Sequence, residues 1–259
     1  MDSIFDHYTF DPSAVETGPL QGLRIAVQPN VSVQGWPAEA GSRALENFTA
    51  VEDATILRRL RESGATVVGS TQMSEFGFGL NGSRAGEALG TKAVDVELVM
   101  DLMGESRQAA GKVGACGLKP SFGLLSSLGL IGLIPSMECL GLLAVNVDSI
   151  RKTLAAMAGP DPMDFSQPDE PALNFAAFGF EPRTIRIGMI TQADGSFPAE
   201  QQIGLQKTAD ELAQAGFSVT ELSFSEIELF PLVHSIVGSV EASSCAGRYD
   251  SVRYGHREP

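Results

Sequence analysis

Two serines in separate glycine-containing segments are the strongest candidates for reactive side chains in this sequence. Ser83 lies in the segment NGSRAGE at residues 81–87, and Ser106 lies in GESR at residues 104–107. A serine nucleophile needs a base that takes its proton and donors that stabilise the oxyanion, which backbone N–H groups of glycine loops can provide. No histidine is near either serine in the sequence, so the base would have to be a desolvated lysine. Judged by spacing alone, polar turns are the simpler interpretation of both segments.

Other patterns that would indicate a catalytic or metal centre do not occur in the sequence. It contains no G-x-S-x-G motif, no phosphate-binding glycine loop and no metal-ligand spacing, so we expect no metal and no cofactor. The widely spaced cysteines indicate buried free thiols rather than a disulfide framework or a zinc site. The histidines are His7, His234 and His256, and the cysteines are Cys116, Cys139 and Cys245.

The composition restricts the classes of protein to which the chain can belong. Its 259 residues include 32 acidic and 18 basic side chains, the formal net charge is −14, and 43% of the residues are hydrophobic. This apolar content excludes wholesale disorder, and the negative charge disfavours direct binding to nucleic acid or to an anionic membrane. The N-terminus lacks the pattern of a secretory signal, and no run of eighteen apolar residues occurs, so we expect a cytoplasmic protein without a membrane span.

Hydrophobic periodicity predicts two units of alternating strands and helices. In the first unit, a buried strand at 23–27 precedes a helix that Asp53 caps and Gly64 ends, and a second strand follows at 66–68. The second unit has a strand at 184–190, a helix at 199–215 and a strand at 217–222. This order favours parallel strand pairs, so we predict an α/β fold.

The remaining segments are expected to be less regular, apart from a helix at 147–157. Residues 1–20 are interpreted as an N-terminal lead-in, and residues 21–259 as a single domain. Within it, we expect loops at 31–48 and at the glycine-rich residues 104–135, and either a helix or a buried strand at 92–103. The proline-rich residues 159–183 are a surface crossing at which the domain could divide into two lobes.

Several segments carry a resemblance to a known family. Residues 18–27 (GPLQGLRIAV), 64–76 (GATVVGSTQMSEF) and 114–123 (GACGLKPSFG) are followed by AGPDP at 158–162 and by a family-like stretch at 241–255. Together they resemble the amidase-signature enzymes, and most closely the A subunit of the tRNA-dependent (Glu/Asp-tRNA) amidotransferases. The likeness runs from about residue 18 to the C-terminus, and it implies a mixed β-sheet flanked by helices.

The resemblance also implies a catalytic site, and this sequence departs from it. In the family a lysine is the base, a bridging serine relays the proton, and a second serine attacks an amide carbonyl. The lysine position holds Ser70 here, the bridging serine matches Ser83, and the nucleophile position holds Glu105. A second family lysine, after the opening strand, is replaced by Gln28. A hydroxyl cannot act as a base in place of an amine, and a carboxylate at position 105 would repel the developing oxyanion.

These departures favour a catalytically inactive homologue, a pseudoenzyme that acts as a scaffold or partner-binding subunit. The alternative is an amidase, or an amidotransferase A subunit, with a rearranged serine site. It would use Ser83 or, after a shift by one residue, Ser106 as the nucleophile. Its base would be another lysine, for which the candidates are Lys92, Lys112 and Lys119.

A third hypothesis is that the pocket of the family's catalytic site is retained but binds a ligand instead of catalysing a reaction. Glu105 and Arg107, with Ser70 and Ser83, could bind a small polar or cationic molecule. The simpler interpretation is that Glu105 forms an ion pair with Arg107 or with a nearby lysine.

Length leads to an expectation about partners. Members of the family usually continue well beyond the position of Pro259, and the further strands and helices would cover the sheet. Exposed apolar surface and open sheet edges favour association. We therefore expect a homodimer or a heteromeric complex, with no direct nucleic-acid or membrane contact.

Overall fold

The chain consists of two compact units, one of residues 1–175 and 238–259 and the other of residues 176–237. Their boundary falls inside the expected crossing at 159–183. The computed structural model describes residues 4–8, 17–79, 82–170, 173–175, 179, 181–190, 198–250, 252 and 255–257. Parts of the segments named above lie outside the described residues: parts of the lead-in and of the crossing, Asn81, and Ser251, Arg253 and Tyr254 of the stretch 241–255.

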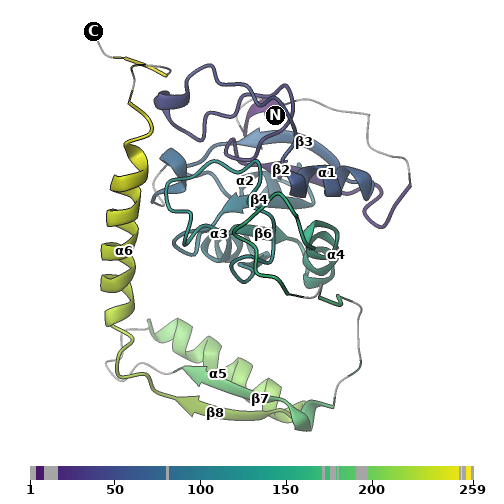
Figure 1. Ribbon diagram of the computed structural model, residues 1–259. Coiled ribbons are helices and arrows are strands. Elements are labelled where there is room, and N and C mark those ends of the chain that lie inside the picture. Colours follow the sequence, from purple (N-terminus) through teal and green to yellow (C-terminus); the bar gives the residue numbers. More distant parts are fainter. Residues whose placement is uncertain are drawn as a thin grey trace. The chain divides into compact units, whose positions relative to one another are not determined.

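A six-stranded mixed β-sheet forms the centre of the first unit, in the spatial order β1-β3-β2-β4-β6-β5 (Figure 1). β2 pairs in parallel with both β3 and β4, whereas β1, β5 and β6 join in antiparallel pairs. The predicted α/β fold with a mixed sheet is therefore confirmed. The strands are β1 (Phe5–Tyr8), β2 (Arg24–Val27), β3 (Thr66–Thr71), β4 (Val96–Met100), β5 (Cys116–Leu118) and β6 (Leu140–Ala144).

Helices cover both faces of this sheet because successive residues of a strand point to opposite sides. On β2, Ile25 and Val27 join the core that includes α1 and α4, whereas Ala26 joins the core that includes α2 and α3. Every residue of β4 and β6 is buried, as expected for central strands covered on both faces. The helices are α1 (Thr55–Glu62), α2 (Glu87–Gly90), α3 (Glu105–Val113) and α4 (Val147–Met157).

Local predictions in the first unit are partly confirmed. The expected parallel strand–helix–strand unit is present as β2, α1 and β3. The expected cap is wrong, because the N-cap residue of α1 is Ala54. The carboxylate of Asp53 instead accepts a hydrogen bond from the backbone N–H of Gln34 at 2.8 Å and pairs with Arg61 at 2.5 Å. Part of the expected lead-in forms β1, which pairs with β3.

The glycine-rich segment at 104–135 is more regular than expected, because it contains α3 and β5. Its glycines permit close packing instead of forming one long loop. A Cβ atom on Gly117 would lie 2.6 Å from the carbonyl oxygen of Ser106, and one on Gly141 would lie 2.6 Å from the Cβ of Ser106. The glycines of β5 and β6 therefore allow the N-terminal half of α3 to lie directly against the sheet.

The second unit is a smaller α/β element. Strands β7 (Arg186–Ile190) and β8 (Ser218–Leu222) pair in parallel, and helix α5 (Ala199–Gln214) connects them. This confirms the strand–helix–strand prediction, with bounds that differ by up to two residues. Large apolar side chains on this unit are exposed, including Ile203, Ile190 and Leu222.

Helix α6 (Leu229–Ala246) begins in the second unit and ends in the first. Among the described residues, it is the one helix whose length and composition would suit a membrane span, with a mean hydropathy of 1.2 over 18 residues. Its C-terminal half packs on the first unit, where Glu241 accepts a hydrogen bond from the backbone N–H of Ser136 at 2.9 Å. Gly238 and Ala242 are buried in this half.

Candidate functional site

The carboxyl ends of the three parallel strands bring several of the family-like positions to one edge of the sheet. Gln28 directly follows β2, and Ser70 lies near the end of β3. The loop 101–104 connects β4 to α3, which begins at Glu105. Ligands of open α/β sheets bind at this edge, where loops and helix N-termini converge. The fold therefore places these residues where a site is expected.

A buried carboxylate is the centre of this cluster. Glu105 is the first residue of α3 and is only 4% exposed. Its Oε1 atom accepts hydrogen bonds from Gln28 Nε2, at 3.1 Å, and from the hydroxyl of Ser83. The Oε1 atom of Gln28 in turn accepts from the backbone N–H of Met100 at 2.7 Å. The structure thus brings together Gln28, Ser83 and Glu105, and the glutamate carboxylate connects them.

Burial raises the pKa of Glu105 above its ordinary value of 4.5. The negative charge of Asp101 acts in the same direction, whereas the hydrogen bonds from Ser83 and Gln28 lower the pKa. The net shift is upward, so the folded protein holds this proton more tightly than the unfolded chain does. Stability must then fall as the pH rises from about 4.5 through the raised pKa.

Substitution of Glu105 by glutamine is expected to flatten this pH dependence. Glutamine keeps the side-chain oxygen that accepts from Ser83 and Gln28, but it carries no buried charge. Denaturant unfolding followed by the fluorescence of the single tryptophan, Trp36, should therefore show the variant gaining stability relative to wild type between pH 5 and pH 8. Because other buried carboxylates remain, the difference between the two proteins isolates Glu105. A difference that is constant with pH would contradict the raised pKa.

Ser70 is not part of the hydrogen-bonded cluster. Its side chain is buried, and its hydroxyl has no hydrogen-bond partner among the described residues. The sequence assigned the base position to Ser70 and only a secondary lysine position to Gln28. In the structure, Gln28 is the residue that contacts Glu105.

Ser106 is turned into the protein interior. It is fully buried, and its hydroxyl donates to the carboxylate of Asp101. The same carboxylate accepts from the backbone N–H groups of Gly104, at 2.7 Å, and of Ser106, at 3.2 Å. Arg107 also pairs with Asp101, at 3.6 Å, so the expected ion pair between Arg107 and Glu105 is wrong. Asp101 therefore organises the loop, a role that sequence reasoning did not assign to it.

No lysine acts on either serine. All five lysines of the sequence lie within the described residues, and none of their amines hydrogen-bonds Ser83 or Ser106. Lys92, Lys112 and Lys119, the alternative bases, thus make no contact that would activate a hydroxyl. Of the described residues, no group of three or more His, Cys, Asp or Glu side chains is arranged to hold a metal ion.

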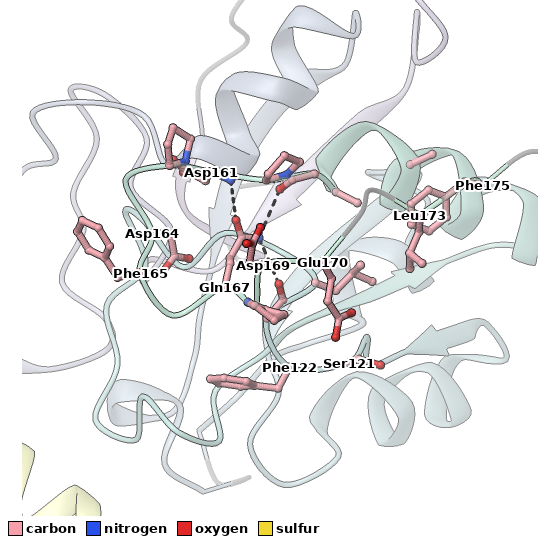
Figure 2. A pocket seen from close by; sticks show the side chains of 18 residues that line it. Ser121, Phe122, Asp161, Asp164, Phe165, Gln167, Asp169, Glu170, Leu173 and Phe175 are labelled. Carbon is pink, nitrogen blue, oxygen red and sulfur yellow. Dashed lines mark hydrogen bonds between the residues drawn. The ribbon is translucent and has the colours of Figure 1, made fainter.

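Sequence reasoning also missed a pocket elsewhere on the first unit. It has a volume of about 710 Å³ and is lined by the turn after β5, the end of α4, residues within 158–170, Leu173 and Phe175 (Figure 2). The prolines and acids of that segment predict only a surface crossing. None of Gln28, Ser70, Ser83 and Glu105 lines this pocket.

Curated relatives are similar in sequence to nearly the whole of this chain. The A subunit of the glutamyl-tRNA(Gln) amidotransferase of Thermus thermophilus is 33% identical over 279 residues, covering 98% of this chain and 59% of that protein. The corresponding A subunit of Natronomonas pharaonis is 32% identical, covering 95% of this chain and 64% of that protein. The chain therefore spans about three-fifths of the length of these relatives.

Solved structures show the same fold at lower sequence identity. The A subunit of the glutamyl-tRNA(Gln) amidotransferase of Thermotoga maritima superposes with a TM-score of 0.80 at 20% identity, covering 98% of this chain and 60% of that one. A chain from a vestigial protein complex, described as revealing the origins of an s-triazine catabolic enzyme, gives a TM-score of 0.80 at 23% identity, covering 98% and 64%. The peptide amidase of Stenotrophomonas maltophilia gives 0.77 at 24% identity, covering 92% and 55%.

A family model supplies the last comparison. The model named Amidase matches residues 6–91 and 85–258, which together include almost the whole chain. These matched ranges contain the sheet, the Glu105 cluster and the second unit. By this match, the chain belongs to the amidase family.

Proposed function

We propose that this chain is a catalytically silent member of the amidase family that acts as a partner-binding subunit. One observation carries the first half of the proposal: Ser83 and Gln28 both donate to the carboxylate of Glu105. A serine at that position would be a nucleophile beside the bridging serine. The carboxylate instead accepts the hydroxyl hydrogen bond and introduces negative charge where an oxyanion would develop.

The amide-hydrolysing alternative has less support. It requires Ser83 or Ser106 to attack a substrate. The hydroxyl of Ser83 donates to Glu105, and Ser106 is fully buried and donates to Asp101. It also requires a base, and no lysine amine contacts either serine. Loss of one member of a catalytic triad already lowers the rate by several orders of magnitude. A rearranged site would therefore need both a new nucleophile position and a new base.

Exposed apolar surface supports the second half of the proposal. Along α6, Phe230, Ile236 and Val240 are among the large apolar side chains that are 60% exposed or more. Monomeric proteins seldom expose large contiguous apolar surface, and such surface marks interaction sites. The relatives are named as subunits, and one structural neighbour belongs to a complex. We therefore propose that the chain forms a homodimer or a heteromeric complex in the cytoplasm. This assembly makes no direct contact with nucleic acid.

An activity assay tests the catalytic half. The purified protein is incubated with simple amides, glutamine and asparagine, and ammonia release is measured against a buffer blank. We expect no turnover above the blank. Turnover that disappears in Ser83→Ala or Ser106→Ala would show that a serine of this chain is active, and would overturn the proposed inactivity.

Light scattering tests the association half. At micromolar concentration, we expect the native protein to have a mass above that of one chain, either as a dimer or with a co-purifying subunit. Ile236→Glu places a charge on the exposed apolar surface of α6 and should weaken this association. Ser239→Glu, at an exposed polar position of the same helix, is the matched control and should leave it intact. A lone monomer of native protein would contradict the proposal.

A further inference from the structure

The pocket at the end of α4 has the size of a ligand site. Its volume of about 710 Å³ lies within the range of roughly 300–1,000 Å³ that is usual for small organic ligands. All of its walls belong to the first unit. None of the residues invoked for the proposed function lines it, so it is an independent feature of the fold.

Hydrogen bonds fix the segment that forms one wall. Gln167 accepts from the backbone N–H of Asp161 at 2.7 Å and donates to the carbonyl of Gly123 at 3.2 Å. The Asp161 carboxylate accepts from the hydroxyls of Thr55, at 2.6 Å, and Ser126, at 2.7 Å. Figure 2 shows Asp161 and Gln167 close together in the middle of this wall. The wall is therefore tied to α1 and to the turn after β5.

Apolar side chains form much of the rest of the lining. Phe165 is 94% exposed, Leu173 is 60% exposed, and Phe122 is 47% exposed. In the view of Figure 2, Asp169 and Glu170 lie between Phe165 on one side and Leu173 on the other. Exposed aromatic rings and carboxylates in the lining of one pocket suit a ligand that has both an apolar body and a positive charge.

The charge of the lining has one sign. Four carboxylates line the pocket, and the lining contains no lysine, arginine or histidine. Asp161 and Asp164 are occupied by hydroxyl and backbone donors. Asp169 and Glu170, in contrast, form no ion pair and accept no side-chain hydrogen bond within the described part of the chain. Two carboxylates are therefore available to a ligand.

The arginines next to the pocket do not neutralise these two carboxylates. Arg59 donates to the carbonyls of Met157, at 2.8 Å, and Pro160, also at 2.8 Å. Arg151 donates to the carbonyl of Phe175 at 2.9 Å and pairs with Asp148. Both guanidinium groups thus support the backbone around the pocket.

We propose that this pocket binds a small organic cation with an aromatic or aliphatic body. Asp169 and Glu170 supply the negative charge that pairs with the cationic group. Phe122, Phe165 and Leu173 contact its apolar body, and the rings add a cation–π attraction. This inference goes beyond the proposed function and uses none of its residues.

Calorimetric titration of the full chain with benzamidine, an aromatic amidinium, tests this site. Benzamide has a similar shape but no charge, and it is the matched probe. We expect benzamidine to bind with a submillimolar Kd and benzamide at least about tenfold more weakly, a difference that two partly solvated charge pairs can supply. Raising the NaCl concentration should weaken the binding of benzamidine.

Two double variants locate the binding. Asp169→Asn with Glu170→Gln should raise the benzamidine Kd at least about tenfold. Asp210→Asn with Glu211→Gln removes the same charge from exposed positions of α5, and it should leave the Kd unchanged. The fluorescence of Trp36 confirms that the first unit, which contains the pocket, is folded in each variant. No measurable binding of benzamidine, equal binding of benzamide, or an unchanged Kd in the pocket variant would each overturn the proposal. Because these outcomes depend on other residues than the amide assay does, the two proposals fail independently.

Discussion

Replacement of Asp101 by alanine is expected to lower the free energy of unfolding of the first unit by about 3–5 kcal/mol. The Asp101 side chain is fully buried and accepts from the backbone N–H groups of Gly104 and Ser106 and from the hydroxyl of Ser106. Alanine would leave these three donors without an acceptor in the interior, and each unsatisfied buried group costs about 1–3 kcal/mol. Arg107 would also lose its partner.

The measurement uses the single tryptophan. Trp36 is buried in the core that includes α1 and α4, so its fluorescence during denaturant unfolding reports on the first unit. Asp148→Ala is the matched control: this aspartate also pairs with basic side chains, Arg151 and Lys152, but it is exposed at the start of α4. Exposed pairs of this kind contribute little, so the control should stay close to wild type. Equal effects of the two substitutions would contradict the central role of Asp101.

Elements whose signal is local could be predicted from the sequence. The buried run before Val27, the helical spacing of Ile56, Leu57 and Leu60, and the terminating Gly64 together predicted β2 and α1. Tertiary contacts decided the remaining details. Asp53 does not cap α1, because Gln34 and Arg61 engage its carboxylate, and neither partner is evident from the local sequence.

The candidate site shows the same division between local and long-range information. The family resemblance indicated that Glu105 holds the nucleophile position, and this assignment depends only on the residues of its own loop. The contact between Gln28 and Glu105 spans 77 positions of sequence. Only the parallel pairing of β2 with β4 brings those two residues together. For the same reason, the family resemblance assigned the base position to Ser70, whereas in the structure Gln28 is the one of these two residues that contacts Glu105.

Reconstruction of a reactive serine is the second large effect that we expect. In the double variant Gln28→Lys with Glu105→Ser, a lysine would replace the amide that now contacts position 105, with Ser83 beside both. Serine is shorter than glutamate, so the substitution also opens the space that the carboxylate fills. Desolvation lowers the pKa of a buried lysine, which favours the neutral amine that a base requires. We expect labelling by a fluorophosphonate to rise at least about tenfold over wild type, because nucleophile and base act as a unit.

Two further variants decide what such labelling means. Glu105→Ser alone should stay near the wild-type rate, because no base contacts the new hydroxyl. Ser70→Lys with Glu105→Ser should also stay low, because the Ser70 hydroxyl makes no hydrogen bond to Gln28, Ser83 or Glu105. If the double variant with Ser70→Lys is labelled and the one with Gln28→Lys is not, the base position is Ser70 on β3. If neither double variant reacts although Trp36 fluorescence shows both folded, Glu105 does not occupy the nucleophile position. The geometry favours the first outcome, since of the two family lysine positions, Gln28 and Ser70, it is Gln28 that hydrogen-bonds position 105.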